Sequence, residues 1–317
     1  MNTHRRVRML GTSRRRRAHP LPTTTKETMS AKLDAVLERL SELSRRGYYN
    51  PYTRFDWPAD VPRDSWWMDP EFLTVHGTDE ILDGDVSIRL SQAETINFFS
   101  LHVHGIRELM GEVAIRIHTP RYRRASEYLH HFLGEENDHM WFFAEFCNRY
   151  WDGVYPAAAP SPLAATTDAD AGPWNDFVVF SRILIFEELF DYYNARLGTS
   201  TVVPPIVAEL HNAHHHDENR HVAFGKRLVE WLYAEALENG GACGKPAVAT
   251  YIKNYIEHSV ASMYNPRCYA YAGVANPLAL RRRLLGHPAR RQVHSDIMRR
   301  LDRFYLRLGL YEGSWVR

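Results

Sequence analysis

Hydrophobic residues recur every three or four positions over long stretches of the chain, with polar residues between them. This period of about 3.6 residues is typical of amphipathic α-helices, and no stretch of useful length alternates with the period of two that a strand needs. Pro120 separates two of the periodic runs, Pro204 and Pro205 open another, and Gly240 closes it. Ser91 and Glu94 have capping-box spacing near the start of one helix. We predict helices at about 31–46, 88–118, 121–151, 173–198, 206–239, 246–264 and 289–308.

Two of the long predicted helices carry a Glu-x-x-His motif. Glu136 and His139 form one, and Glu218 and His221 form the other. Residues three, four or seven apart share a face of a helix, so His214 lies on the face of the second motif. Carboxylate and imidazole groups together suit iron, manganese or zinc. These five side chains are therefore predicted metal ligands.

A rival pair, Glu127 and His130, has the same spacing as the first motif. It begins nine residues before Glu136, so the two pairs point to opposite sides of one helix. Polar residues surround the rival, whereas Leu129, Phe132 and Phe143 surround the first motif. We therefore predict that the rival pair faces solvent.

Each motif is preceded by a helix with further acidic residues. Glu108 and Glu112 are the candidates on the helix at 88–118, and they share a face. Glu187 and Glu188 are the candidates on the helix at 173–198, and periodicity does not choose between them. A single Glu on one helix and Glu-x-x-His on the next, twice over, is the pattern of ferritin-like di-iron bundles.

The predicted fold is accordingly all-α: a ferritin-like four-helix bundle with additional N- and C-terminal helices. The Pro- and Ala-rich stretch at 156–173 is the predicted long crossover between the two helix pairs. Residues 1–30 are predicted to be a basic, disordered tail, since the first 17 include seven Arg and no apolar export segment. Residues 31–317 form one predicted domain, whose metal-binding core spans about 85–240.

Charge and cysteine content narrow the classes of function. The formal net charge is +1, so no overall field favours nucleic acid, and no uncharged apolar stretch is long enough to cross a membrane. The three Cys residues are scattered, which argues against a disulfide framework and a thiolate metal site and indicates the cytoplasm.

The pattern resembles the AurF-type di-iron arylamine N-oxygenases, which add a third histidine four residues before the last Glu-x-x-His. His214, Glu218 and His221 match that feature, and Glu136 and His139 match the earlier motif. The resemblance favours Glu187 over Glu188 and points to Glu108. It therefore implies this ligand set: Glu108, Glu136, His139, Glu187, His214, Glu218 and His221.

The resemblance also implies an activity. Two iron ions would activate O2 to oxidise an aromatic amine to a hydroxylamine, nitroso or nitro product in natural-product biosynthesis. It implies an external electron donor and suggests a homodimer, and manganese is the alternative metal. The competing hypotheses are a di-iron oxidase acting on an aliphatic amine, a C–H bond or an azoxy-forming substrate, and an iron-storage or peroxide-scavenging bundle.

Overall fold

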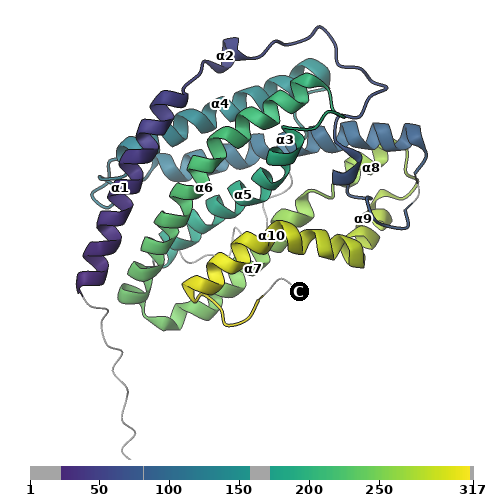
Figure 1. Cartoon of the computed structure of the whole chain (residues 1–317). Coiled ribbons are helices and arrows are strands. Elements are labelled where there is room, and N and C mark those ends of the chain that lie inside the picture. Colours follow the sequence, from purple (N-terminus) through teal and green to yellow (C-terminus); the bar gives the residue numbers. More distant parts are fainter. Residues whose placement is uncertain (1–22, 81, 158–171, 315–317) are drawn as a thin grey trace, which may run out of the picture.

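The described part of the computed structural model comprises residues 23–80, 82–157 and 172–314. Four long helices form its centre (Figure 1): α3 (Gly84–Ala114), α4 (Ser126–Tyr150), α5 (Asn175–Leu197) and α6 (Pro205–Gly240). Helix α3 packs on α4, α5 packs on α6, and α4 also contacts α6. The described residues contain no strand. The prediction of an all-α, ferritin-like helical bundle is thus confirmed.

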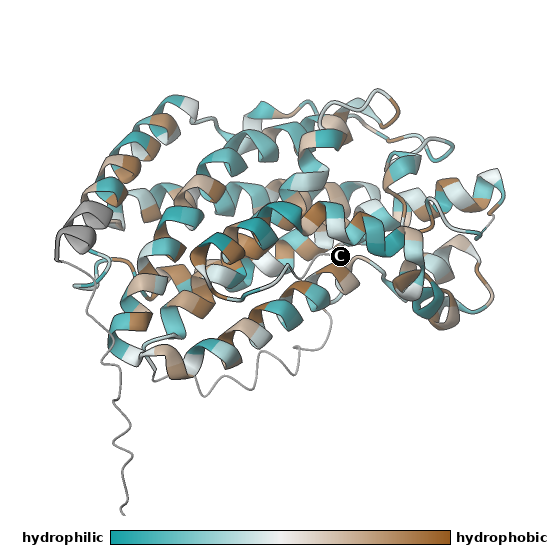
Figure 2. Ribbon diagram, turned by 60° about the horizontal axis from the view of Figure 1, so that its bottom comes forward, coloured by the Kyte–Doolittle hydropathy of each residue, from teal (hydrophilic) through white to brown (hydrophobic). Residues whose placement is uncertain are grey.

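The remaining elements cover this bundle. Helix α1 (Thr23–Gly47) lies against α4 and α6, and α7 (Lys245–Ser262) and α10 (Pro288–Leu308) lie against α5 (Figure 1). Helix α8 (Pro266–Ala272) contacts α3 and α9 (Pro277–Gly286). Three one-turn elements complete the chain: α2 (Pro51–Arg54), η1 (Pro70–Phe72) and η3 (Ala242–Gly244). Most helices carry both hydrophobic and hydrophilic residues along their length (Figure 2), as amphipathic packing requires.

Two local predictions were wrong, and two short helices were missed. Helix α1 begins at Thr23, so residues 23–30 of the predicted tail are helical, while residues 1–22 lie outside the described residues. The predicted capping box lies inside α3: the side chain that caps this helix is Asp83, which accepts a hydrogen bond from the Val86 N–H. Helices α8 and α9 were not predicted, although an Asn cap and a Pro at the first turn open each of them.

Most of the predicted crossover, residues 158–171, lies outside the described residues. In the described ranges no helix is both long enough and apolar enough to cross a membrane.

Candidate metal centre

The two Glu-x-x-His motifs meet in the middle of the bundle. Helix α4 contributes Glu136 and His139, and α6 contributes Glu218 and His221. All four side chains are buried, and one donor atom from each lies within 4.8 Å of the others. In the described part of the chain, these four Glu and His side chains lie close enough together to hold a metal ion.

The two carboxylates lie between the two imidazoles. Nδ1 of His221 is 2.8 Å from Glu136 and 3.3 Å from Glu218. On the other side, Nδ1 of His139 is 3.8 Å from Glu136 and 3.7 Å from Glu218. Both carboxylates therefore lie close to the inward-facing nitrogen of both motif histidines.

Each motif histidine is held from behind by an acidic residue of the opposite helix. Nε2 of His139 is 3.1 Å from Asp217 on α6, and Nε2 of His221 is 2.8 Å from Glu135 on α4. Arg220 joins the two carboxylates, donating hydrogen bonds to Glu135 at 2.7 Å and to Asp217 at 2.5 Å. A histidine that donates its Nε2–H in this way turns the Nδ1 lone pair inward, as a metal ligand requires.

The charges of the cluster are strongly coupled. Burial acts to raise the pKa of Glu136, but His139 and His221 lower this pKa to about 2. Burial acts to lower the pKa of His139, but the neighbouring carboxylates of Asp217 and Glu136 raise it to about 10. Burial and the neighbouring Glu218 raise the pKa of Glu187 well above its usual range. Without a metal ion, protons on the imidazoles would supply the positive charge that these carboxylates need.

Many of these buried donor atoms form no hydrogen bond. They include both carboxylate oxygens of Glu136, Glu187 and Glu218 and one nitrogen each of His139, His214 and His221. Leaving such groups unpaired in a protein interior costs free energy, and native structures rarely do so. Oxygen and imidazole donors around a shared centre are the ligands that iron and manganese take. The residues present therefore fit a metal centre.

His214 and Glu187 lie at the edge of this cluster. Nε2 of His214 is 3.2 Å from Glu218, and its Nδ1 is 2.7 Å from the side-chain amide of Asn194. Glu187 is buried beside Glu218, whereas Glu188 forms an ion pair with Lys226. The structure therefore favours Glu187 among the two adjacent candidates.

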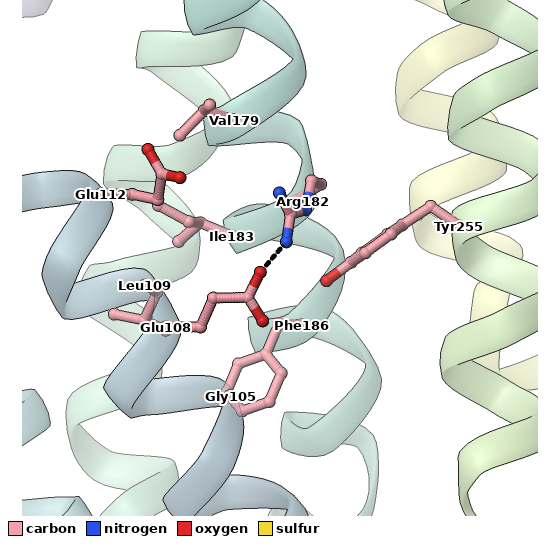
Figure 3. A pocket seen from close by; sticks show the side chains of 9 residues that line it. All are labelled: Gly105, Glu108, Leu109, Glu112, Val179, Arg182, Ile183, Phe186 and Tyr255. Atoms are coloured by element: carbon pink, nitrogen blue, oxygen red, sulfur yellow. Dashed lines mark hydrogen bonds and ion pairs between the residues drawn. The ribbon is translucent and has the colours of Figure 1, made fainter. Parts of the chain in front are cut away.

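Glu108 does not lie in the cluster. Its side chain is 59% exposed and forms an ion pair with Arg182 in a surface pocket between α3, α5 and α7, opposite Tyr255 (Figure 3). Glu112 pairs with Arg116 at 2.8 Å. The buried positions that follow His102 on α3 are Ile106 and Leu109, and a helix turns by 100° per residue, so Glu108 points away from the bundle centre. The structure thus brings together six of the seven predicted ligands.

The sequence analysis missed the residues that support the ligands. Asp217, Glu135 and Arg220 hold the motif histidines, and Asn194 holds His214. One signal was present: an acidic residue directly precedes the Glu of each motif, in Glu135–Glu136 and Asp217–Glu218.

Comparison with known proteins agrees with this site. A family model described as p-aminobenzoate N-oxygenase AurF matches residues 30–309, which is most of the chain. No curated protein matches significantly. Since the family match covers nearly all of the helical bundle and its buried Glu and His cluster, the chain belongs to the AurF family of oxygenases.

Proposed function

We propose that this protein is a di-iron oxygenase that uses O2 to oxidise an aromatic amine to a hydroxylamine and then to nitroso and nitro products. Membership of the AurF family supports oxygenase chemistry. The observation that carries the metal assignment is the convergence of buried carboxylate and imidazole atoms that have no hydrogen bond. Iron rather than manganese is proposed because the reaction reduces O2.

The proposed ligands are the six side chains that the bundle brings together: Glu136, His139, Glu187, His214, Glu218 and His221. When bound, the two iron ions would supply electrons to O2. Asp217 and Glu135 orient two of the imidazoles, and Phe143 and Phe132 pack against His214 and His221 and help to exclude water from them.

The first oxygenation has a simple balance. An N–H bond of the amine breaks and an N–O and an O–H bond form, while the second oxygen atom of O2 leaves as water. Reducing that second oxygen atom to water consumes two electrons and two protons. We therefore propose an external electron donor as a partner of the protein. A cytoplasmic location and a homodimer remain predictions.

Oxygen uptake by the iron-loaded protein tests this function. We expect an aniline bearing a small polar group to consume O2 in a fixed ratio to the amine lost, and an alkylamine of similar size to consume much less. Glu218→Ala should abolish the uptake because it removes a proposed ligand, whereas Glu127→Ala, a change at an exposed position of α4, should preserve it.

Equal uptake with alkylamines would move the substrate class to aliphatic amines. Iron-dependent uptake that is independent of any amine and produces a ferric mineral would contradict the oxygenase function and support iron storage.

A further inference from the structure

Asn194 of α5 lies among three histidines in the interior of the bundle. Its side chain has no exposed surface, and neither have His102 of α3 and His211 and His214 of α6. The amide oxygen of Asn194 is 2.6 Å from Nδ1 of His211. The amide nitrogen is 2.7 Å from Nδ1 of His214 and 3.5 Å from Nε2 of His102. One amide therefore contacts a proposed metal ligand and two histidines that are not proposed ligands.

The two close contacts require His211 and His214 to carry their protons on different nitrogens. Burial lowers the pKa of both imidazoles well below the usual range, so each ring is neutral and has one N–H. An amide oxygen only accepts a hydrogen bond, and an amide nitrogen only donates. The ring that faces the oxygen must therefore be protonated at Nδ1, and the ring that faces the nitrogen must be protonated at Nε2. A half-turn of the amide exchanges these roles but keeps the two tautomers opposite.

His102 favours one of the two amide orientations. Nδ1 of His102 is 2.9 Å from the carbonyl oxygen of Phe98, which only accepts, so the proton of this ring lies on Nδ1 and its Nε2 carries a lone pair. The amide nitrogen of Asn194 can donate to that lone pair, whereas the amide oxygen cannot. Without a metal ion, the nitrogen of Asn194 is therefore expected to face His102 and His214, as it does in this structure.

A metal ion at His214 requires the other orientation. Nε2 of His214 faces the cluster, 3.2 Å from Glu218, and forms no hydrogen bond within the described residues. A metal takes the lone pair of this nitrogen, so the proton of the ring must lie on Nδ1 and the oxygen of Asn194 must face it. The same half-turn places the nitrogen of Asn194 against Nδ1 of His211, whose proton must then lie on Nε2. In each ring one N–H bond breaks and another forms, with no net uptake of protons or electrons.

We propose that metal binding turns the side-chain amide of Asn194 over and thereby reverses the tautomer of His211, which is not itself a proposed ligand. Asn194 is thus a positioning residue, because its oxygen must hold Nδ1–H of His214 when the metal is bound. The inference rests on His214 as a ligand in the proposed function. It extends the metal centre by one helical turn, to a ring that packs on Phe98 and Phe99.

Nitrogen-15 NMR of the histidine side chains measures the tautomers directly in the full-length protein. Zn(II) serves as a diamagnetic probe that binds carboxylate and imidazole ligands, and spectra are recorded for chelator-treated protein before and after its addition. We expect His211 to be protonated at Nδ1 without metal and at Nε2 with Zn(II), while His214 changes in the opposite direction. His211→Gln and His214→Gln identify the signals of the two rings.

Two variants of Asn194 separate the role of its oxygen from that of its nitrogen. Asn194→Asp offers two acceptors and no donor, so both rings should be protonated at Nδ1 with and without Zn(II), and metal binding should be retained. Asn194→Leu offers neither, and its Zn(II) affinity, measured by competition with a chelator, should fall by about 10- to 100-fold. Asn212→Asp, at an exposed position of α6, should keep the reversal seen in the wild type.

The wild-type spectra decide the question even if a variant does not fold. A tautomer of His211 that stays the same while Zn(II) binds would overturn the inference, and so would equal losses of affinity in Asn194→Asp and Asn194→Leu. Either result leaves the proposed function intact, because the wild type still binds metal. Failure of the wild type to bind Zn(II), Mn(II) or Fe(II) would instead contradict the proposed metal centre itself.

Discussion

At the scale of single residues, the reciprocal hydrogen bonds behind the motif histidines define the site most clearly. His139 of α4 contacts Asp217 of α6, and His221 of α6 contacts Glu135 of α4. Each helix therefore positions a ligand of the other. A register shift between α4 and α6 would break both contacts at once, so they select the alignment in which the two Glu-x-x-His motifs face each other.

This arrangement predicts a loss of metal affinity in Asp217→Ala. The substitution leaves all proposed ligands in place but releases Nε2 of His139, and changes at such supporting positions typically weaken metal binding by about 10- to 100-fold. Asp138→Ala, a change at a neighbouring position of α4 that is not hydrogen-bonded to His139, is the control. Equal affinities in the two variants, measured by competition with a chelator, would show that Asp217 does not position the ligand.

Glu94 predicts a pH dependence of stability far from the metal cluster. Burial raises its pKa to about 7, although hydrogen bonds from Thr74 oppose the shift. Between pH 4.5 and 7 the unfolded chain loses this proton while the folded chain keeps it, so the free energy of unfolding falls as the pH rises.

Glu94→Gln should remove that slope. Relative to this variant, the wild type should lose stability from pH 4.5 to 7 by roughly 3 kcal/mol at most. Urea unfolding at several pH values measures the difference between the two proteins. If the difference in the free energy of unfolding between the two proteins stayed constant from pH 4.5 to 7, the pKa of Glu94 would not be raised in the folded protein.

Residue spacing was sufficient to identify much of the site. Glu136, His139, His214, Glu218 and His221 follow from helical periodicity, and apolar neighbours correctly placed the first motif in the interior. The prediction that Glu108 is a ligand came from the resemblance and not from periodicity. Leu109, the next residue, faces inward, and one step along a helix turns the side chain by 100°, so Glu108 faces away from the cluster. The roles of Asp217 and Glu135 depend on the contact between α4 and α6, which the spacing within either helix does not contain.

At the scale of elements, the packing of α3 against α5 depends on a glycine. Helix α3 packs against α4, α5 and α8, and Gly105 allows its close approach to Phe186 of α5. Helix α3 therefore combines a tight contact with α5 and a buried face of mixed character, which includes Glu94 and His102 as well as Ile106 and Leu109.

Two glycines of α3 provide a matched comparison. Gly105→Ala should destabilise the protein by about 1–3 kcal/mol, because the new methyl group meets the ring of Phe186. Gly111→Ala meets no atom within 4 Å and should stabilise the protein by about 0.5–1 kcal/mol through better helix propensity. Chemical denaturation measures both changes, and a stabilising Gly105→Ala would refute the close contact.

The errors in helix boundaries also belong to this scale. Asp83 caps α3, whereas Ser91 and Glu94 serve long-range contacts with Trp67 and Thr74 from inside the helix. A capping-box spelling is a local signal, and tertiary contacts can use the same residues differently. Helices α8 and α9 are only 7 and 10 residues long, so their periodicity was too brief to detect.

At the scale of the whole molecule, the fold concentrates at its centre buried carboxylates and imidazoles that lack hydrogen-bond partners. Such a core is unfavourable without a cation, so metal should contribute to folding stability. Saturating Fe(II) or Mn(II) under anaerobic conditions should raise the melting temperature of the wild type, and Mg(II) should raise it less because it prefers oxygen ligands. No shift with either transition metal would contradict a metal centre built from these residues.

The central claim is that iron at this cluster transfers oxygen from O2 to an aromatic amine. The most direct measurement is a single turnover of the Fe(II)-loaded protein with 18O2 and an aniline, with the product analysed by mass spectrometry. The predicted result is an N-oxygenated aniline that carries 18O from O2 and is absent when Glu218→Ala is used. An iron-loaded protein that consumes O2 but leaves the aniline unlabelled and unchanged would contradict the account.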